Sequence, residues 1–249
     1  MSVLFWLTDE QIERLRPFFP KSHSKPRVDD RRLLSGIIFV NRNGMRWRDA
    51  PREYGPHKTL WKRWGAMGIF MRMMDGLSAA KTGPQTIMID ATYLKAHRTA
   101  SSLRLKKRDP GRLTGRTKGG INTRLHAVTD QNGRPLSFFM TAGQISDYTG
   151  AAALLDNLPA AHWMRGDCRH DADWFRDAVE EKGIKPCIPG RRSRGKPVRY
   201  DKRKYKRRNR IETMFGKLKD WRRIATRYDR CPNVFFSAIC LAATVIFWL

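Results

Sequence analysis

The stretch that decides the fold of most of the chain is Thr86–Tyr93, with the sequence TIMIDATY. Apolar and β-branched residues fill it, which predicts a buried strand. One carboxylate, Asp90, stands between Ile89 and Ala91 in this strand. A buried charge is costly unless it is paired or binds a metal ion. Asp90 is therefore the first candidate site residue.

The residues after this strand alternate between strand and helix patterns. Two segments joined by the turn signal Asn132-Gly133 predict a hairpin, and the rest predicts helices separated by short strands. Such an order indicates a mixed α/β sheet with helices packed against it. The predicted segments are strands Thr123–Asp130, Pro135–Ala142, His162–Asp167 and Ile184–Pro189, and helices Tyr148–Leu158 and Asp171–Lys182.

The first eighty residues differ in pattern from the rest, because they predict three helices. These helices begin at Thr8-Asp9, at Asp29 and near Gly55-Pro56. The composition changes near residues 81–84, where Lys, Thr, Gly and Pro follow one another. We therefore predict a small all-α domain at 1–80 and an α/β domain at 81–249.

The third helix carries several cations close together, namely Lys58, Lys62 and Arg63. This arrangement suits a helix-turn-helix-like module that reads DNA with its third helix. The alternative is a plain three-helix domain in which Trp61 and Trp64 are core residues.

The charge of the chain restricts its partners. Fifty Lys and Arg face twenty-three Asp and Glu, a formal net charge of +27. Such an excess repels itself in a compact protein unless a polyanion neutralises part of it. Nucleic acid is favoured over a membrane surface or a ribosome, because the cations are interleaved with tryptophan and glycine throughout.

Targeting and redox features point to a cytoplasmic, nucleoid-associated protein with no membrane partner. The first residues lack the basic region of a signal peptide. The apolar segment Val234–Leu249 is shorter than the roughly 20 residues that span a bilayer, so a buried closing helix is predicted. The four cysteines show no metal-finger spacing, which favours reduced thiols.

A Gly-rich basic segment, 102–120, lies between the first two predicted strands. It has no core-forming pattern and is long for a connection, and its part from Lys106 to Lys118 is a candidate clamp on the DNA backbone. The alternative is a disordered, solvated loop. The cations that we assign to DNA contact here are Lys106, Lys107, Arg116 and Lys118.

Two more carboxylates stand where a metal site requires them. Asp167 follows a short predicted strand, although a residue there is often only a cap or an ion-pair partner. Glu212 lies in a predicted helix crowded with cations, with Arg208 one turn before it. Magnesium prefers hard oxygen ligands, and pairs of such ions drive phosphoryl transfer on DNA.

Four residues at fixed intervals make the pattern specific. Tyr205, Arg208, Glu212 and Lys219 reproduce the Y-(2)-R-(3)-E-(6)-K signature of DDE transposases from bacterial insertion sequences. The chain resembles the "family five" and "family four" types of these enzymes. The similar segments are IDATYLKAHR around Asp90, the basic loop and hairpin at 115–147, and RNGMRWRDAPREYGPHKTLWKRW in the first eighty residues.

The resemblance implies that 1–80 is a DNA-binding domain and that 81–249 is a catalytic domain with an RNase H-like fold. Its catalytic and metal-binding residues would be Asp90, Asp167 and Glu212. It implies two Mg²⁺ ions, with Mn²⁺ as a substitute, and cleavage at terminal inverted repeats followed by strand transfer into target DNA. Tyr205, Arg208 and Lys219 would hold DNA. Bringing two element ends together implies a homodimer or a larger assembly on DNA.

The chain departs from the family at one place. Members usually have Asp-Arg-Gly-Tyr or Asp-Lys-Gly-Tyr at the second aspartate, where this chain has Asp167-Cys168-Arg169-His170. Arg169 would forbid a backbone angle reserved for glycine, and His170 could bond a phosphate. This departure supports an alternative: a catalytically impaired or repurposed transposase that acts as a sequence-specific DNA-binding protein. An RNA nuclease of the same fold and a ribonucleoprotein component fit the signature less well.

Overall fold

The computed structural model describes residues 3–19, 29–62, 68–79, 83, 85–102 and 111–249, with the side chains of 61 and 62 left out. The chain forms two compact units. Unit 1 comprises Met1–Leu77, His97–Arg112 and Leu218–Leu249, and unit 2 comprises Ser78–Ala96 and Leu113–Lys217. The units cut across the boundary between residues 80 and 81. The assignment of DNA binding to 1–80 and catalysis to 81–249 therefore stays a prediction.

Unit 2 is built on a mixed sheet. Its strands are β1 (Thr86–Ala96), β2 (Gly115–Thr117), β3 (Gly120–Asp130), β4 (Pro135–Ala142), β5 (Trp163–Arg165) and β6 (Lys185–Cys187). Strand β3 is antiparallel to β1, β2 and β4, whereas β1, β5 and β6 run parallel. The order β2-β3-β1-β5-β6 places β1 centrally.

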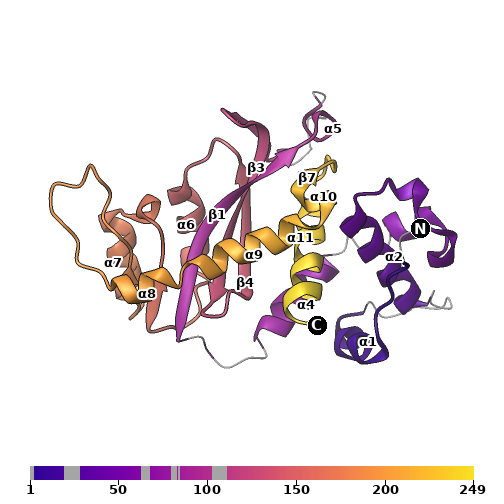
Figure 1. The fold of residues 1–249 in the computed structure, drawn as a ribbon, viewed down its shortest axis with the longest axis horizontal. Coiled ribbons are helices and arrows are strands. Elements are labelled where there is room, and N and C mark those ends of the chain that lie inside the picture. Colours follow the sequence, from indigo (N-terminus) through magenta and orange to yellow (C-terminus); the bar gives the residue numbers. More distant parts are fainter. Residues whose placement is uncertain (1–2, 20–28, 63–67, 80–82, 84, 103–110) are drawn as a thin grey trace. The chain divides into compact units, whose positions relative to one another are not determined.

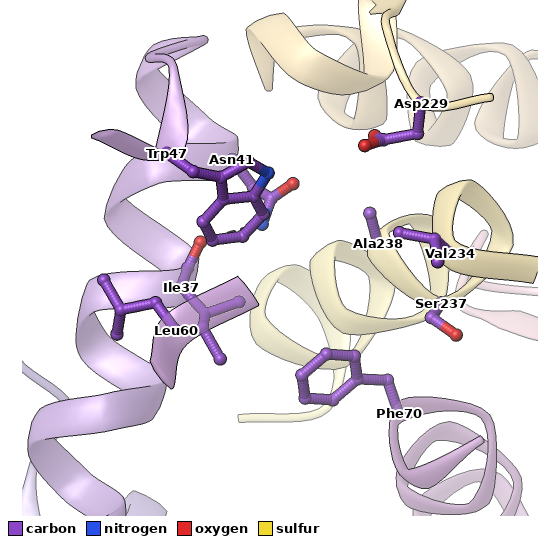
Figure 2. Close-up of a pocket in the computed structure, with 9 residues that line it drawn as sticks. All are labelled: Ile37, Asn41, Trp47, Leu60, Phe70, Asp229, Val234, Ser237 and Ala238. Atoms are coloured by element: carbon purple, nitrogen blue, oxygen red, sulfur yellow. Dashed lines mark hydrogen bonds between the residues drawn. The ribbon is translucent and has the colours of Figure 1, made fainter. Parts of the chain in front are cut away.

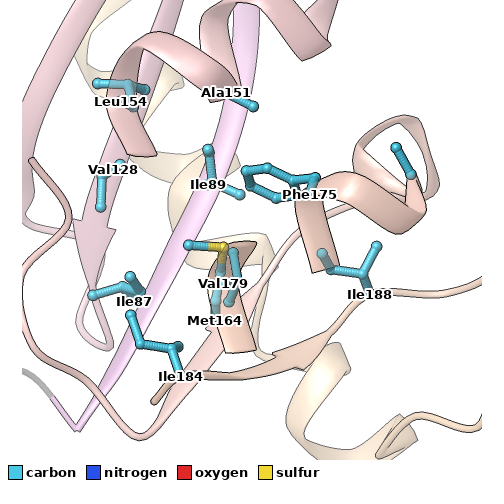
Figure 3. Close-up of a cluster of buried hydrophobic side chains, with 11 residues drawn as sticks. Ile87, Ile89, Val128, Ala151, Leu154, Met164, Phe175, Val179, Ile184 and Ile188 are labelled. Carbon is cyan, nitrogen blue, oxygen red and sulfur yellow. The ribbon is translucent and has the colours of Figure 1, made fainter. Parts of the chain in front are cut away.

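Helices cover both faces of this sheet (Figure 1). Their bounds are α6 (Asp147–Leu155), α7 (Asp173–Glu181), α8 (Lys202–Lys206) and α9 (Asn209–Lys219), of which α9 belongs to unit 2 as far as Lys217. Ile87 and Ile89 of β1 pack with Phe175 of α7 in the core on one face (Figure 3). Successive strand residues point to opposite faces, so Asp90 points to the other face, where α9 crosses the sheet (Figure 1).

The mixed sheet with helices packed on it confirms the predicted α/β fold class. Strand β4 has the predicted bounds, and the other predicted strands and helices of unit 2 differ by a few residues at their ends. One expectation was wrong in part. The basic segment 102–120 is not a loop at its end, because β2 pairs with β3 over Gly115–Thr117.

Unit 1 is helical. Its helices are α1 (Asp9–Leu15), α2 (Asp30–Asn43), α3 (His57–Lys62), α4 (Ile69–Ala79, to Leu77 in this unit), α5 (Arg98–Ser101), α10 (Arg222–Ala225) and α11 (Pro232–Phe247), with 3₁₀ turns at Arg16–Phe18, Trp47–Asp49 and Arg52–Tyr54 and the short β7 (Thr226–Arg227). Thr8 caps α1 and Asp29 caps α2, as predicted.

The third helix was predicted to run without a break from near Gly55-Pro56 to Leu77, and this prediction was wrong. Gly68 has φ = 63°, a left-handed backbone conformation that an α-helix does not contain, and a separate helix, α4, follows it. The predicted closing helix is confirmed as α11, whose central residues are buried. Helices α2, α3, α4 and α11 face a small gap of about 20 Å³ lined by Ile37, Phe70 and Ala238 among others (Figure 2). Within the described residues, no helix is long and apolar enough to cross a bilayer.

Candidate active site

Strand register brings the two aspartates close together, with Asp90 in the middle of β1 and Asp167 just after the end of β5. In the parallel pair of β1 and β5, Met88 lies opposite Arg165. Asp90 lies two residues after Met88, and Asp167 lies two residues after Arg165. The carboxyl ends of neighbouring parallel strands are a usual place for ligand sites. The negative charge of Asp167 is close enough to raise the pKa of Asp90.

Asp90 lies on the face of β1 that α9 crosses, and its side chain is 14% exposed. Burial raises the pKa of Asp90, although the positive charge of Arg208 and a hydrogen bond work against this. That bond comes from the backbone N–H of Ala91, which donates to Asp90 Oδ1 at 2.8 Å. The carboxylate is thus held on one side by its own backbone and on the other by a guanidinium.

Arg208 joins two of the three predicted carboxylates. Its Nη1 donates to Asp90 Oδ2 at 2.6 Å, and its Nη2 donates to Glu212 Oε1 at 2.5 Å. Asp90 and Arg208 are 118 residues apart in sequence. The helix predicted around Glu212 is not continuous, because α8 ends at Lys206 and α9 begins at Asn209. Arg208 therefore extends from the turn between two helices, while Glu212 lies in the first turn of α9.

Asp167 is held by the turn that follows it. His170 is 1% exposed, and its Nδ1 lies 2.8 Å from Asp167 Oδ1. The backbone N–H of Arg169 donates to the same oxygen at 3.0 Å. Burial alone would raise the pKa of Asp167, but the hydrogen bond from His170 and the charges of His170 and Arg208 outweigh burial and hold this pKa below its usual value.

Their environments therefore raise the pKa of Asp90 and lower the pKa of Asp167. Opposite pKa shifts in neighbouring carboxyl groups recur at functional sites.

The Cys168–His170 turn corrects two expectations about the family departure. Because the His170 ring is buried against Asp167, it is not placed to bond a phosphate. Arg169 causes no backbone strain, since Leu113 is the sole non-glycine residue with positive φ in the described ranges. The 3₁₀ turn at 168–170 is ordinary backbone, and here the altered residues serve to orient Asp167.

Two further signature residues lie on the same pair of helices. Tyr205, in the last turn of α8, has its ring centroid 5.8 Å from the Arg208 guanidinium carbon. Burial raises the pKa of Tyr205. Lys219 ends α9 about two turns after Glu212, with an exposed side chain.

The three carboxylates suit a divalent metal by chemistry but are not yet gathered around one point. Hard oxygen donors are what Mg²⁺ and Mn²⁺ prefer. In the part of the chain that the structure describes, however, no group of three or more His, Cys, Asp or Glu residues is close enough to hold an ion. Arg208 and His170 instead supply the cationic or donor partner of each aspartate. Metal binding would require Arg208 to release at least one carboxylate oxygen.

The other predicted DNA contacts are placed unevenly. Lys58 is exposed on α3. Arg116, in β2, and Lys118, in the turn after it, are exposed as well. Arg63, Lys106, Lys107 and the side chain of Lys62 lie outside the described residues.

Sequence reasoning missed two residues at this site. His170 was assigned to DNA and not to Asp167. Arg165 was not singled out, although it stands two residues before Asp167 at the end of β5 and is 4% exposed. A charged residue between Met164 and Gly166 in a short strand was the available signal, because an alternating position there shares the face of Asp167.

Comparison with known proteins finds two family models that match the chain. A family model described as "Putative transposase of IS4/5 family" matches residues 7–74, and the model "Transposase DDE domain" matches residues 81–248. The "Putative transposase for insertion sequence element IS6501" of Brucella ovis is 36% identical over 131 residues, 52% of this chain and 99% of that protein. The corresponding IS402 protein of Burkholderia cepacia is 28% identical over 181 residues, 64% of this chain and 83% of that protein.

Among solved structures, the Mos1 strand transfer complex is similar with a TM-score of 0.29 and 14% identity, over 90% of this chain and 82% of that one. The likeness to this structure is too low to carry an argument. The DDE domain model, in contrast, covers more than half of the chain. The chain therefore belongs to the DDE-domain transposases of the insertion-sequence type.

Proposed function

We propose that this transposase cuts DNA at the terminal inverted repeats of its element and joins the released 3′ ends to target DNA, with Asp90, Asp167 and Glu212 as its catalytic carboxylates. The observation that carries the proposal is the contact of Arg208 with both Asp90 and Glu212. Arg208 thereby links two carboxylates that are distant in sequence, and the charge of Asp167 is close enough to Asp90 to raise the pKa of Asp90.

The carboxylates would hold two divalent metal ions, Mg²⁺ or Mn²⁺, which when bound activate the attacking hydroxyl and neutralise charge at the scissile phosphate. The chain's own residues position this site. His170 and the Arg169 N–H fix the orientation of Asp167. The guanidinium of Arg208 lies between two carboxylates. When those carboxylates bind metal ions instead, the N–H donors of Arg208 would become available to a phosphate oxygen.

Tyr205 and Lys219 would hold the DNA strand near the cleaved bond. Tyr205 is half-buried beside Arg208 and presents an aromatic ring and a hydroxyl on the same side as that guanidinium. Lys58, Lys62, Arg63, Lys106, Lys107, Arg116 and Lys118 would supply phosphate contacts along the rest of the duplex. Joining two element ends would require a homodimer or a larger assembly on DNA.

The test is divalent-metal-dependent cleavage of a duplex that carries the ends flanking the gene. Wild type should cut at the element boundary only with Mg²⁺ or Mn²⁺, and Glu212→Gln should lose at least about 10²-fold in rate. Glu181→Gln makes the same chemical change at an exposed position of α7 and should cut like wild type. Cleavage by Glu212→Gln at the wild-type rate would disprove the assignment.

A second function is supported by a specific observation. The carboxylates are already engaged by Arg208 and His170, and His170 belongs to the segment that departs from the family. A protein that binds the element ends specifically but cuts neither with Mg²⁺ nor with Mn²⁺ would be a repurposed, DNA-binding transposase.

A further inference from the structure

A basic pocket lies beside the candidate site in unit 2 and has no role in the mechanism above. It has a volume of about 390 Å³ and is lined by Arg165, Asp201, Arg203, Lys204 and Arg207. Four of these five residues are cations. A pocket with such walls attracts an anion, provided that the charges are not already neutralised by neighbours.

The guanidinium of Arg165 has buried nitrogen atoms without a hydrogen-bond partner among the described residues. Arg165 is 4% exposed, and its Nε and Nη1 atoms are buried with no hydrogen-bond partner in the described structure. Met164, the residue before it, points into the core on the opposite face of the sheet. Buried polar atoms almost always have a partner, and an unpaired buried charge is strongly unfavourable. An unsatisfied guanidinium that lines an open pocket points to a ligand that completes it.

The wall of the pocket comes from α8. Asp201 caps this helix by accepting from the N–H groups of Arg203 and Lys204, and the Lys204 ammonium lies 2.8 Å from its carboxylate. These bonds lower the pKa of Asp201 to about 2, so it stays ionised, with Lys204 as its partner. The single carboxylate of the pocket is thus matched by one cation, which leaves the charges of Arg165, Arg203 and Arg207.

Arg203 and Arg207 extend this charge to the surface. Both are exposed, and they are four residues apart at the end of α8, where like charges repel. Beside the pocket, the Lys204 ammonium lies 4.5 Å from the centroid of the Trp163 ring. Three guanidiniums around one opening match an anion with several oxygens better than a single carboxylate, because each guanidinium donates in a planar fork.

We propose that this pocket binds a backbone phosphate of a DNA strand, next to the phosphate at the carboxylates. The choice of DNA rests on the proposed function, whereas the anion site rests on the pocket alone. Arg165 stands two residues before Asp167, and Arg207 is adjacent to Arg208. A strand seated at Asp167 and Arg208 therefore has further phosphates within reach of the pocket, and anchoring one of them fixes the position of the strand.

The test measures the salt dependence of binding to a random-sequence duplex in EDTA, so that metal at the carboxylates plays no part. Arg165→Met removes the buried charge and Arg207→Gln an exposed one. Each should weaken binding several-fold and reduce the slope of log K against log salt by up to about 1. Lys182→Gln, an exposed cation at the end of α7, removes the same net charge and should leave the slope unchanged. Unchanged slopes in both pocket variants, or an equal change in Lys182→Gln, would overturn the proposal.

Thermal unfolding with inorganic phosphate separates a strand site from a site for a free anion. Phosphate should raise the Tm of wild type and not that of Arg165→Met. Without phosphate, Arg165→Met should be at least as stable as wild type, since it removes an uncompensated charge; a structural arginine would give the opposite result. A phosphate effect on Tm without any change in DNA slope would mean a free-anion site and would overturn the assignment to DNA.

The outcome is separable from that of the cleavage test. Glu212→Gln should bind the duplex in EDTA with the wild-type slope. If no cleavage is found but the pocket variants lose slope, the pocket assignment stands and the catalytic one fails. If cleavage is found and the slopes do not move, the reverse holds.

Discussion

Individual side chains in unit 2 carry charges that burial makes expensive, and each is handled differently. Arg208 engages Asp90 and Glu212, and His170 engages Asp167. His126 is buried as a neutral ring, with its Nε2 3.0 Å from the Thr141 hydroxyl. Because folding shifts the pKa values of Asp90, Asp167 and His126, the stability of the protein must depend on pH.

His126 should make the fold sensitive to mild acid. Burial lowers its pKa from 6.5 to about 3, so below pH 6.5 the unfolded chain binds a proton that the folded chain does not. This contribution is fully present above about pH 6.5 and is lost by about 1.4 kcal/mol per pH unit as the pH falls toward 3. Denaturant unfolding at neutral and mildly acidic pH measures it. His126→Gln keeps a partner for Thr141 and should lose most of the difference; an unaltered pH dependence would contradict the assignment.

His170→Phe should expose the opposite sign of linkage at Asp167. The folded-state pKa of this aspartate lies below its usual value, so its contribution to stability is present above about pH 4 and disappears as the pH falls through that folded value. Removing the ring nitrogen should raise the pKa of Asp167 and cost about 1.5–3 kcal/mol at neutral pH. The deficit should shrink below about pH 4. Carboxyl NMR titration of Asp167 checks the pKa directly, and a deficit that does not vary with pH would refute the explanation.

At the scale of elements, the closeness of a helix to the sheet determines which side chains its glycines tolerate. Gly150 faces β3 from α6, and a Cβ built on it would lie 2.0 Å from the Nδ1 of His126. Gly216 lies in α9, and a Cβ there would meet nothing within 4 Å. Glycine is therefore required at position 150, where α6 packs closely on β3. At position 216 glycine only lowers the helix propensity of α9.

These two glycines predict opposite effects of one substitution. Gly150→Ala should destabilise unit 2 by about 1–3 kcal/mol, because the buried His126 ring would have to move. Gly216→Ala should stabilise it by about 0.5–1 kcal/mol through helix propensity. Urea unfolding of the full chain measures the change in the free energy of unfolding for both variants. Each variant is the matched control for the other. Changes of the same sign would show that the packing of α6 on β3 is not as described.

For the whole molecule, the net charge of +27 sets the terms of association with DNA. The charge is distributed over both units and includes exposed residues such as Lys58 and Arg116. Neutralising phosphates releases counterions, so affinity depends steeply on salt.

Binding to a random duplex should therefore fall by about 10³-fold or more between about 50 and 200 mM salt, which corresponds to about six or more phosphate contacts. Fluorescence anisotropy across a salt series measures the slope. A duplex analogue with an uncharged backbone should bind weakly and with little salt dependence. A shallow slope with the natural duplex would mean that most of the cations do not meet phosphates.

Local sequence was sufficient for most elements of unit 2 and for naming its carboxylates. Alternation and turn chemistry predicted β4 and the hairpin, because strand faces and tight turns depend on neighbours along the chain. Asp90, Asp167 and Glu212 were identified from residue type, spacing and resemblance, and their catalytic roles remain predictions. The local sequence did not predict the break at Gly68 or the strand at Gly115–Thr117, since tertiary context overrides weak local signals there.

Only the tertiary structure decided which groups meet. Arg208 reaches Asp90 across 118 residues of sequence, and His170 turns onto Asp167 and not toward solvent. Arg165 lines an open pocket, and its buried Nε and Nη1 atoms have no hydrogen-bond partner in the part of the chain that the structure describes. These contacts follow from the parallel register of β1 and β5 and from the turn between α8 and α9. The sequence by itself determined the chemical groups and the elements that carry them, whereas burial and charge pairing depend on long-range packing, which spacing along the chain does not encode.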